Sequence, residues 1–266
     1  MRADRLLLKT AGLVIREKKQ SEQDSLVTLL TPENGVILAR VRGARRLRGR
    51  LTAATELFAY SEFTLFLRDP VSSVDAAEPK RIFYGLRSDP EAFALAAYFA
   101  QLTYDFAGSQ SSTSFLLRLL LNSFAFLEEN TMPQLLIKGI FEWQCMASNG
   151  YHPDLSACYR CGASSGEAVW FFPQQGQLIC KACGGDRVKG GRPLSADLLA
   201  AMNRAMSSDL REAYSFRLGE DSLRRFASLA EEYLLTRLEY RPKTLQYYHS
   251  LLAEIPMADS REKKAD

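Results

Sequence analysis

The sequence predicts an α+β protein in which a small N-terminal β-barrel is followed by an all-α domain that carries an inserted four-cysteine module. Three observations support this class. Short segments rich in β-branched and aromatic residues, separated by turn residues, occupy residues 1–79. Helical periodicity replaces them in residues 80–153 and 191–255, and two Cys-x-x-Cys pairs lie between these helical parts, in residues 154–190. The chain has 266 residues, 47% of them hydrophobic, which is enough for about two domains with their own cores.

The barrel is expected in residues 1–79, because several short antiparallel strands follow one another there. Strands are predicted at residues 13–15, 26–30, 36–41 and 57–67. The segment Thr31-Pro32-Glu33-Asn34-Gly35 has the turn chemistry of a β-hairpin, since Pro fixes φ and Asn-Gly tolerates positive φ. Residues 69–80 contain Pro, Ser and Asp and are interpreted as a linker or loop.

The helical domain is predicted in residues 80–153 and 191–255. Its first helix begins at Asp89-Pro90, a cap residue followed by proline, and runs to about residue 106. Further helices are predicted from Ser112 or Ser114 to 127, at 131–147, from 195 onward, at 221–238 and at 244–253. Residues 256–266 are polar and are expected to form a flexible tail.

Four cysteines stand in two pairs with the spacing of a zinc site, and they are Cys158, Cys161, Cys180 and Cys183. Each Cys-x-x-Cys turn directs two thiolates at one point, and the second turn completes a tetrahedron. Gly162 and Gly184 follow the pairs, where the turn is expected to need a positive φ. Four thiolates leave no open position for water or substrate, so we expect one structural Zn²⁺ per chain. Two disulfides or a redox-active dithiol are the alternatives.

The overall charge does not by itself indicate a polyanionic ligand. The formal net charge is +3, and four thiolates with one Zn²⁺ would lower it by two, to about +1. Any attraction to nucleic acid must therefore come from local clustering of charge. The sequence shows no apolar stretch of the length of a signal peptide or membrane span, so a cytoplasmic protein without a membrane partner is expected. A reducing compartment favours thiolate–zinc bonds over disulfides.

A strip of arginines without an intervening acid occupies residues 40–50, and its six members are Arg40, Arg42, Arg45, Arg46, Arg48 and Arg50. The first two share one face of a predicted strand, and the other four follow on a loop. The guanidinium group matches phosphate oxygens in a bidentate way, so the strip predicts an anionic ligand, and single-stranded nucleic acid would suit a basic groove of a small barrel. A solvated charge run, or pairing with distant acids, is the alternative. The aromatic residues of 57–67 fit the barrel core better than a base-stacking surface.

Several N-terminal motifs resemble, in their order, the RecO family of recombination mediators. These motifs are Gly12-Leu13-Val14-Ile15, Glu22-Gln23-Asp24, Thr28-Leu29-Leu30-Thr31, Gly35 and Gly43-Ala44-Arg45-Arg46. The order of barrel, helices, cysteine quartet and helices matches as well, so the resemblance covers nearly the whole chain. Ser21 and Gly49 depart from the glycine and serine that the family usually has there, which bears on the path of the arginine loop.

The resemblance implies an oligonucleotide/oligosaccharide-binding (OB) fold for the barrel, a structural zinc and a function without catalysis. RecO proteins bind single- and double-stranded DNA, anneal complementary strands and act with RecR to load RecA onto DNA coated by the single-strand binding protein. The expected partners are therefore DNA, RecR and the acidic C-terminal tail of the single-strand binding protein, at the nucleoid. That tail needs a hydrophobic pocket beside a basic residue, for which helix 115–127, helix 222–238 and the corner at 241–243 are candidates.

The remaining residues favour binding over catalysis. Cys145 is expected to be a buried small hydrophobe, His152 to lie in a loop, and His249 has no obvious partner. The sequence has two histidines and neither a phosphate-binding loop nor a Gly-x-Ser-x-Gly motif, so no catalytic residue is predicted. The alternatives are a nucleic-acid-modifying enzyme and a zinc-ribbon interaction module in transcription or translation. A zinc-finger glycosylase needs Pro at position 2, where this chain has Arg2.

Overall fold

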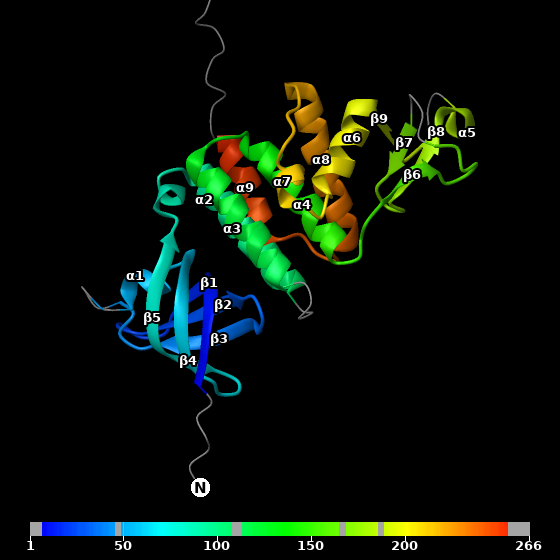
Figure 1. Ribbon diagram of the computed structural model, residues 1–266. Coiled ribbons are helices and arrows are strands. Elements are labelled where there is room, and N and C mark those ends of the chain that lie inside the picture. Colours follow the sequence, from blue (N-terminus) through cyan, green and yellow to red (C-terminus); the bar gives the residue numbers. More distant parts are fainter. Residues whose placement is uncertain are drawn as a thin grey trace, which may run out of the picture.

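The computed structural model describes residues 7–45, 49, 51–107, 113–164, 169–185 and 189–254. Figure 1 shows a barrel of strands, a bundle of helices above it, and a small sheet at the end of the bundle that is remote from the barrel. This arrangement confirms the predicted α+β class. Within the described ranges, no helix is both long and apolar enough to cross a lipid bilayer. The predicted tail at 256–266 lies outside the described residues.

Five strands form a closed barrel in the order β1-β2-β3-β5-β4. They are β1 (Leu7–Lys19), β2 (Ser25–Thr31), β3 (Gly35–Val41), β4 (Ala59–Phe66) and β5 (Ser72–Ile82). Neighbouring strands are antiparallel except β3 and β5, which pair in parallel. The short helix α1 (Thr52–Thr55) connects β3 with β4. The first strand extends beyond the predicted 13–15 at both ends, because the exposed residues Leu7, Lys9 and 16–19 do not continue the apolar run.

The interpretation of residues 69–80 as a linker or loop is wrong, because most of this segment belongs to β5. The strand pairs with β4 over most of its length and with β3 at Ser72 and Ser73, and so completes the barrel. Pro79 lies opposite Ser61, where the register of the β4–β5 pair shifts, so the missing N–H group of proline is tolerated. The strand is hard to recognise because only two of its residues, Ser72 and Val74, are buried.

The barrel has two apolar faces, one inside it and one towards the helices. Its interior is filled from the alternating buried positions of the strands, among them Val27, Val41 and Phe63. The second face belongs to the core of the helical domain and includes Leu30 and Phe58. The Phe58 ring lies 5.5 Å from that of Phe93 and 4.9 Å from that of Phe124, measured between ring centroids. Phe58 and Phe63 are thus core residues, as expected for the aromatic stretch 57–67.

The helical domain begins after β5 with the 3₁₀ turn η1 (Tyr84–Arg87). Its helices are α2 (Pro90–Phe106), α3 (Thr113–Glu129), α4 (Gln134–Ser148), α6 (Ala196–Ala205), α7 (Leu210–Ala213), α8 (Glu220–Arg237) and α9 (Lys243–Glu254). The carboxylate of Asp89 accepts hydrogen bonds from the N–H groups of Glu91 and Ala92, which is the predicted N-cap of α2. At Gly139, α4 approaches α8 so closely that an added Cβ would lie 2.6 Å from the ring of Phe226.

The cysteine module is a small four-stranded sheet with the strand order β6-β8-β7-β9. Its elements are β6 (Asp154–Cys158), β7 (Val169–Phe172), β8 (Gln177–Cys180), α5 (Lys181–Gly184) and β9 (Arg192–Leu194). Phe171 packs against Trp143 of α4 and Tyr233 of α8, with ring centroids 6.2 and 5.8 Å away. Arg192 of β9 also donates two hydrogen bonds to the carboxylate of Glu232 on α8. The module is therefore anchored to the helical bundle by both packing and charge.

Candidate metal centre and nucleic-acid interface

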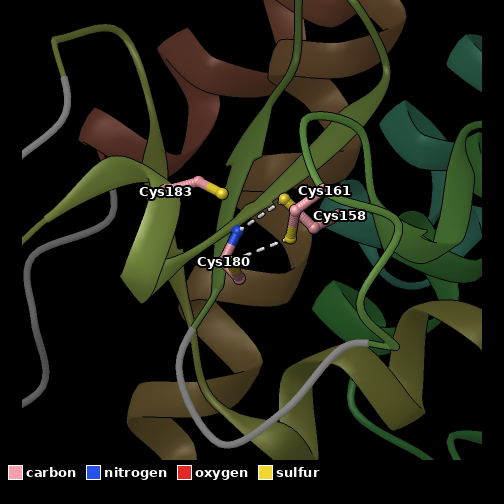
Figure 2. A group of neighbouring side chains, drawn as sticks. All are labelled: Cys158, Cys161, Cys180 and Cys183. Carbon is pink, nitrogen blue, oxygen red and sulfur yellow. Dashed lines mark hydrogen bonds between the residues drawn. The ribbon is translucent and has the colours of Figure 1, made fainter.

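The four predicted cysteines converge at the edge of the small sheet, and Figure 2 shows their side chains gathered between two segments of the chain. One pair, Cys158 and Cys161, stands at the end of β6 and in the turn that follows it. The other pair, Cys180 and Cys183, stands at the end of β8 and in α5. Their four sulfur atoms lie within 4.8 Å of one another. His152 is not part of this cluster, since its ring faces the carbonyl of Pro153.

The spacing of the sulfur atoms fits a metal ion better than disulfide bonds. The Sγ atoms of Cys161 and Cys180 are 3.7 Å apart. Sulfurs at the corners of a tetrahedron with metal–sulfur bonds of about 2.3 Å are separated by about 3.8 Å, whereas a disulfide bond is about 2.05 Å long. All five cysteines of the chain are free thiols in this structure. The donor set is thus four sulfurs within 4.8 Å of one another, and the Cys161–Cys180 pair already has the separation that a tetrahedral ion needs.

Backbone groups around the cluster hold the two turns in place. The N–H of Cys180 donates to Cys158 Sγ at 3.3 Å, and this hydrogen bond is the main reason why the pKa of Cys158 is lowered to about 6. This shift favours the thiolate, the form that binds metals, at Cys158, whereas hydrogen bonds with Cys161 and Cys180 raise the pKa of Cys183. Gly162 has the expected positive φ of 72°. After the second pair the expectation for Gly184 is wrong, because this residue ends α5 and Gly185 has the positive φ, 73°.

Of the predicted DNA-binding residues, the described ones stand exposed on and just after β3. Arg40 and Arg42 share the outer face of the strand, and Arg45 lies in the following turn. Within the described part of the chain, none of these three guanidinium groups pairs with a carboxylate. This argues against charge pairing as the role of these three arginines. The other members of the strip, Arg46, Arg48 and Arg50, lie outside the described residues.

The turn after β3 is fastened to the turn between β1 and β2. Gly43, with φ +68°, donates its N–H to Asp24 Oδ1 at 2.9 Å, and the N–H of Arg45 donates to the carbonyl of Gln23 at 3.1 Å. The arginine side chains are therefore presented from a backbone that is held in position at both turns.

Strand register adds basic residues that sequence reasoning missed. Lys18 on β1 stands opposite Leu26 on β2, which stands opposite Arg40 on β3. Residues in register point to the same side of a sheet, so Lys18 and Arg40 belong to one face. Arg16 lies two residues before Lys18 on β1 and faces the same way. The spacing of Arg16 and Lys18 was visible in the sequence, but their distance from Arg40 depends on the register of three strands.

Arg42 lies between two hollows of the barrel surface. One hollow, of about 560 Å³, is bordered by Ser21, Glu22, Gln23, Asp24 and Gly43 of the two fastened turns. The other, of about 360 Å³, is bordered by Arg68, Asp75 and the edge of β4. Arg68 comes from the β4–β5 connection and is a further basic residue that the sequence analysis did not single out. Arg42 thus has Arg68 as a basic neighbour across one of these hollows.

A groove of about 570 Å³ lies in the helical domain between α4, α8 and α9. Its walls combine apolar residues such as Leu135 and Leu252 with the basic Arg224 and Arg241. Two of the three predicted locations for a peptide pocket, helix 222–238 and the corner at 241–243, thus border the same groove.

An ion network crosses the floor of the groove. Lys138, which is 1% exposed, donates to Glu142 Oε1 at 2.8 Å and to Glu231 Oε2 at 2.7 Å. The hydroxyl of Tyr98 donates to Glu142 Oε1 at 2.8 Å. Burial raises the pKa of Glu142 to about 7, although the charge of Lys138 acts in the opposite direction. His249 Nε2 lies 3.0 Å from Glu231, so the expectation that His249 has no partner is wrong.

Known proteins match this chain over both of its main parts. Residues 1–83 match the family described as "Recombination protein O N terminal", and residues 87–246 match "Recombination protein O C terminal". The DNA repair protein RecO of Acetivibrio thermocellus is 30% identical over 244 residues, which cover 92% of this chain and 97% of that protein. The RecO of Symbiobacterium thermophilum is 31% identical over 244 residues, covering 90% and 96%. That of Heliobacterium modesticaldum is 28% identical over 268 residues, covering 98% and 97%. The chain therefore belongs to the RecO family of DNA repair proteins.

Proposed function

We propose that this protein is a recombination mediator without catalytic activity, which binds DNA, anneals complementary single strands and, with RecR, helps load RecA onto DNA coated by the single-strand binding protein. Family membership supports the repair role. The observation that carries the DNA-binding part is the barrel face on which Lys18, Arg40 and Arg42 stand exposed and form no ion pair with any described carboxylate. Such a face attracts a phosphate backbone.

The barrel is proposed to be an OB-fold. OB-folds bind nucleic acid on the face of strands 2 and 3 and with the loops between strands 1 and 2 and between strands 4 and 5. The corresponding places here hold Arg40 on β3 and Arg42 just after it, the turn at 20–24 beside Arg42, and Arg68 after β4. We accordingly divide the chain into a DNA-binding barrel at 1–79, a helical domain at 80–153 and 191–255, and a metal-binding module at 154–190.

Cys158, Cys161, Cys180 and Cys183 are proposed to hold one structural Zn²⁺ per chain. The sulfur separation and the purely thiolate donor set suit zinc, and the four ligands close the coordination sphere. A bound ion there would link β6 to β8 and α5. The side chain of Arg160 already crosses between the two turns, donating from Nη1 to the carbonyl of Cys183 at 2.9 Å. The module thereby presents a fixed surface to α8.

The groove between α4, α8 and α9 is the proposed place for the acidic tail of the single-strand binding protein. Its apolar walls suit apolar side chains, and Arg224 and Arg241 suit a carboxylate. Arg241 has no ion pair with a described residue, whereas Arg224 already pairs with Glu220, so Arg241 is the stronger candidate. Because its proposed partners are DNA, RecR and the single-strand binding protein, we propose a location in the cytoplasm at the nucleoid.

A strand-annealing experiment tests the proposed function directly. Two complementary oligonucleotides, one with a fluorophore and one with a quencher, are coated with single-strand binding protein and mixed with the native protein. We expect the native protein to accelerate quenching, and the double variant Arg40→Gln/Arg42→Gln to lose most of that acceleration. Quenching as slow as without the protein would contradict annealing, and equal rates for both proteins would contradict the role of the barrel face.

A further inference from the structure

A further hollow, distinct from the two beside Arg42 and also of about 560 Å³, lies where the outer face of β1, β2 and β3 meets the helices. Its barrel wall includes the partly exposed Leu26 and Leu38, and its helical wall includes Ala97, Gln101 and Thr244. The volume falls within the range of about 300–1,000 Å³ that small-molecule sites occupy. The hollow is thus an apolar recess with a few polar groups, and it opens onto the same barrel face as Arg40.

Two basic residues of β1, Arg16 and Lys18, line this hollow together with Glu17 between them, whose carboxylate accepts a hydrogen bond from the hydroxyl of Ser25 at 2.9 Å. The Arg16 guanidinium lies over the ring of Tyr104 on α2, 3.6 Å from its centroid, and 3.8 Å from the carboxylate of Asp105. Its side chain remains 44% exposed, so the guanidinium is not enclosed by these two contacts. Lys18 has no ion pair with a described carboxylate and belongs to the row that leads over Leu26 to Arg40.

We infer that this hollow receives an unstacked base of the bound single strand, while Lys18 and Arg40 contact the flanking phosphates. The inference rests on the proposed DNA binding and assigns one base-contacting site within it. A nucleotide joins an anionic phosphate to a flat base with apolar faces, and this combination matches cations placed on two sides of an apolar recess. Neighbouring strands are about 4.8 Å apart, so Lys18 and Arg40 stand about 10 Å from each other across Leu26. Arg16, already stacked on Tyr104, offers a planar group on which a base stacks.

The charge pattern favours a nucleotide over an acidic peptide at this site. The cations continue as one row onto β3, where Arg42 extends them, so a bound strand can follow them from one nucleotide to the next. The groove between α4, α8 and α9 has no such continuation and is a separate site.

The test compares binding of two labelled strands of equal length, oligo(dT) and the same backbone with abasic spacers in place of every base. Ala97→Leu extends an apolar side chain into the hollow without changing any charge. We expect this variant to bind the abasic strand as the native protein does and to bind oligo(dT) more weakly. The dissociation constant for the abasic strand divided by that for oligo(dT) should fall about tenfold, equivalent to about 1.4 kcal/mol for one base contact. Ala196→Leu, at an exposed position of α6, is the matched control and should leave the ratio unchanged.

Leu38→Gln changes the barrel wall of the hollow and provides a second variant if Ala97→Leu does not fold. A ratio unchanged in both folded variants would overturn the inference while leaving DNA binding intact. The inference is also overturned if the variants lose binding of an acidic peptide with an apolar end but keep the native preference for oligo(dT). If the native protein binds neither strand, the proposed DNA binding itself fails. If Arg40→Gln/Arg42→Gln binds both strands as the native protein does, the role of the barrel face fails.

Discussion

The carboxylate of Asp24 accepts a hydrogen bond from the N–H of Gly43 at 2.9 Å, and this contact joins the turn after β1 to the turn after β3. Two arginines of the strip therefore follow β3 at the turn that this hydrogen bond holds in place. This carboxylate thus has a structural role beside the basic strip, because it fixes the turn from which Arg42 and Arg45 project. The arginine side chains are left to face solvent.

Neutralising the barrel face should weaken DNA binding and its dependence on salt. For Arg40→Gln/Arg42→Gln we expect about tenfold lower affinity for oligo(dT) at about 0.1 M salt, because two phosphate contacts are lost. The slope of log affinity against log salt should become shallower by about 1.4, since each contact on a single strand contributes about 0.7. Fluorescence anisotropy over a salt series measures both quantities. Arg211→Gln, at an exposed position of α7, is the control, and an equal loss in that variant would contradict a local effect.

Removing one sulfur from the cluster should lower both metal content and stability. The native protein is expected to contain about one zinc per chain by elemental analysis. Cys158→Ser should contain much less zinc and lose about 3 kcal/mol or more of its free energy of unfolding, because metal loss is among the most damaging mutational mechanisms. Urea denaturation measures the loss. Cys145→Ser is the matched control, since Cys145 is buried in α4 outside the cluster and should leave the zinc content unchanged. Normal stability of Cys158→Ser would refute a structural role for the site.

The contribution of Glu142 to stability should decrease between pH 5 and pH 7. Burial raises the pKa of this carboxyl to about 7 in the folded protein, above its value in the unfolded chain. The folded state therefore binds more protons in this range, and its stability declines as the pH rises towards the folded pKa. Glu142→Gln removes this decline, so the stability of the variant relative to the native protein should rise by up to about 2 kcal/mol from pH 5 to pH 7.

Urea unfolding at the two pH values and constant ionic strength checks the effect of Glu142→Gln. The amide can still accept the hydrogen bond from Tyr98, which limits the structural change. Glu129→Gln, near the exposed end of α3, serves as the control and should keep the native pH dependence. A relative stability of Glu142→Gln that stays constant or falls between the two pH values would contradict the assignment.

The substitution Gly139→Ala should destabilise the contact between α4 and α8. The new Cβ would lie 2.6 Å from the buried ring of Phe226, and such overpacking costs about 1–3 kcal/mol. This cost exceeds the gain of about 1 kcal/mol that alanine brings to a helix. Phe226→Leu removes the obstructing ring, so the double variant should lose less stability than the sum of the two single variants. Additive losses, measured by urea denaturation, would show that the two side chains do not collide.

The sequence predicted those parts of the fold that depend on local pattern. The cap at Asp89-Pro90 and the apolar periodicity placed α2, and the spacing of the cysteines named all four members of the cluster. The sequence did not predict β5, because a strand with one solvent-facing end and a proline at a register shift has no clear alternation of apolar and polar residues. The sequence also did not identify the basic neighbours of the arginine strip, which are Arg16, Lys18 and Arg68. Their distances from the strip depend on strand register, which only the closed barrel defines.

The core of this protein extends without interruption through all three of its parts. Leu30 and Phe58 of the barrel, Phe124 and Trp143 of the helices, and Phe171 and Leu178 of the cysteine module belong to one cluster of buried side chains. Unfolding any part exposes apolar surface on its neighbour, so the free energies of the three parts are coupled. The protein should therefore melt in a single transition, and a change at the cysteine cluster should alter how much of the population keeps an intact DNA-binding barrel.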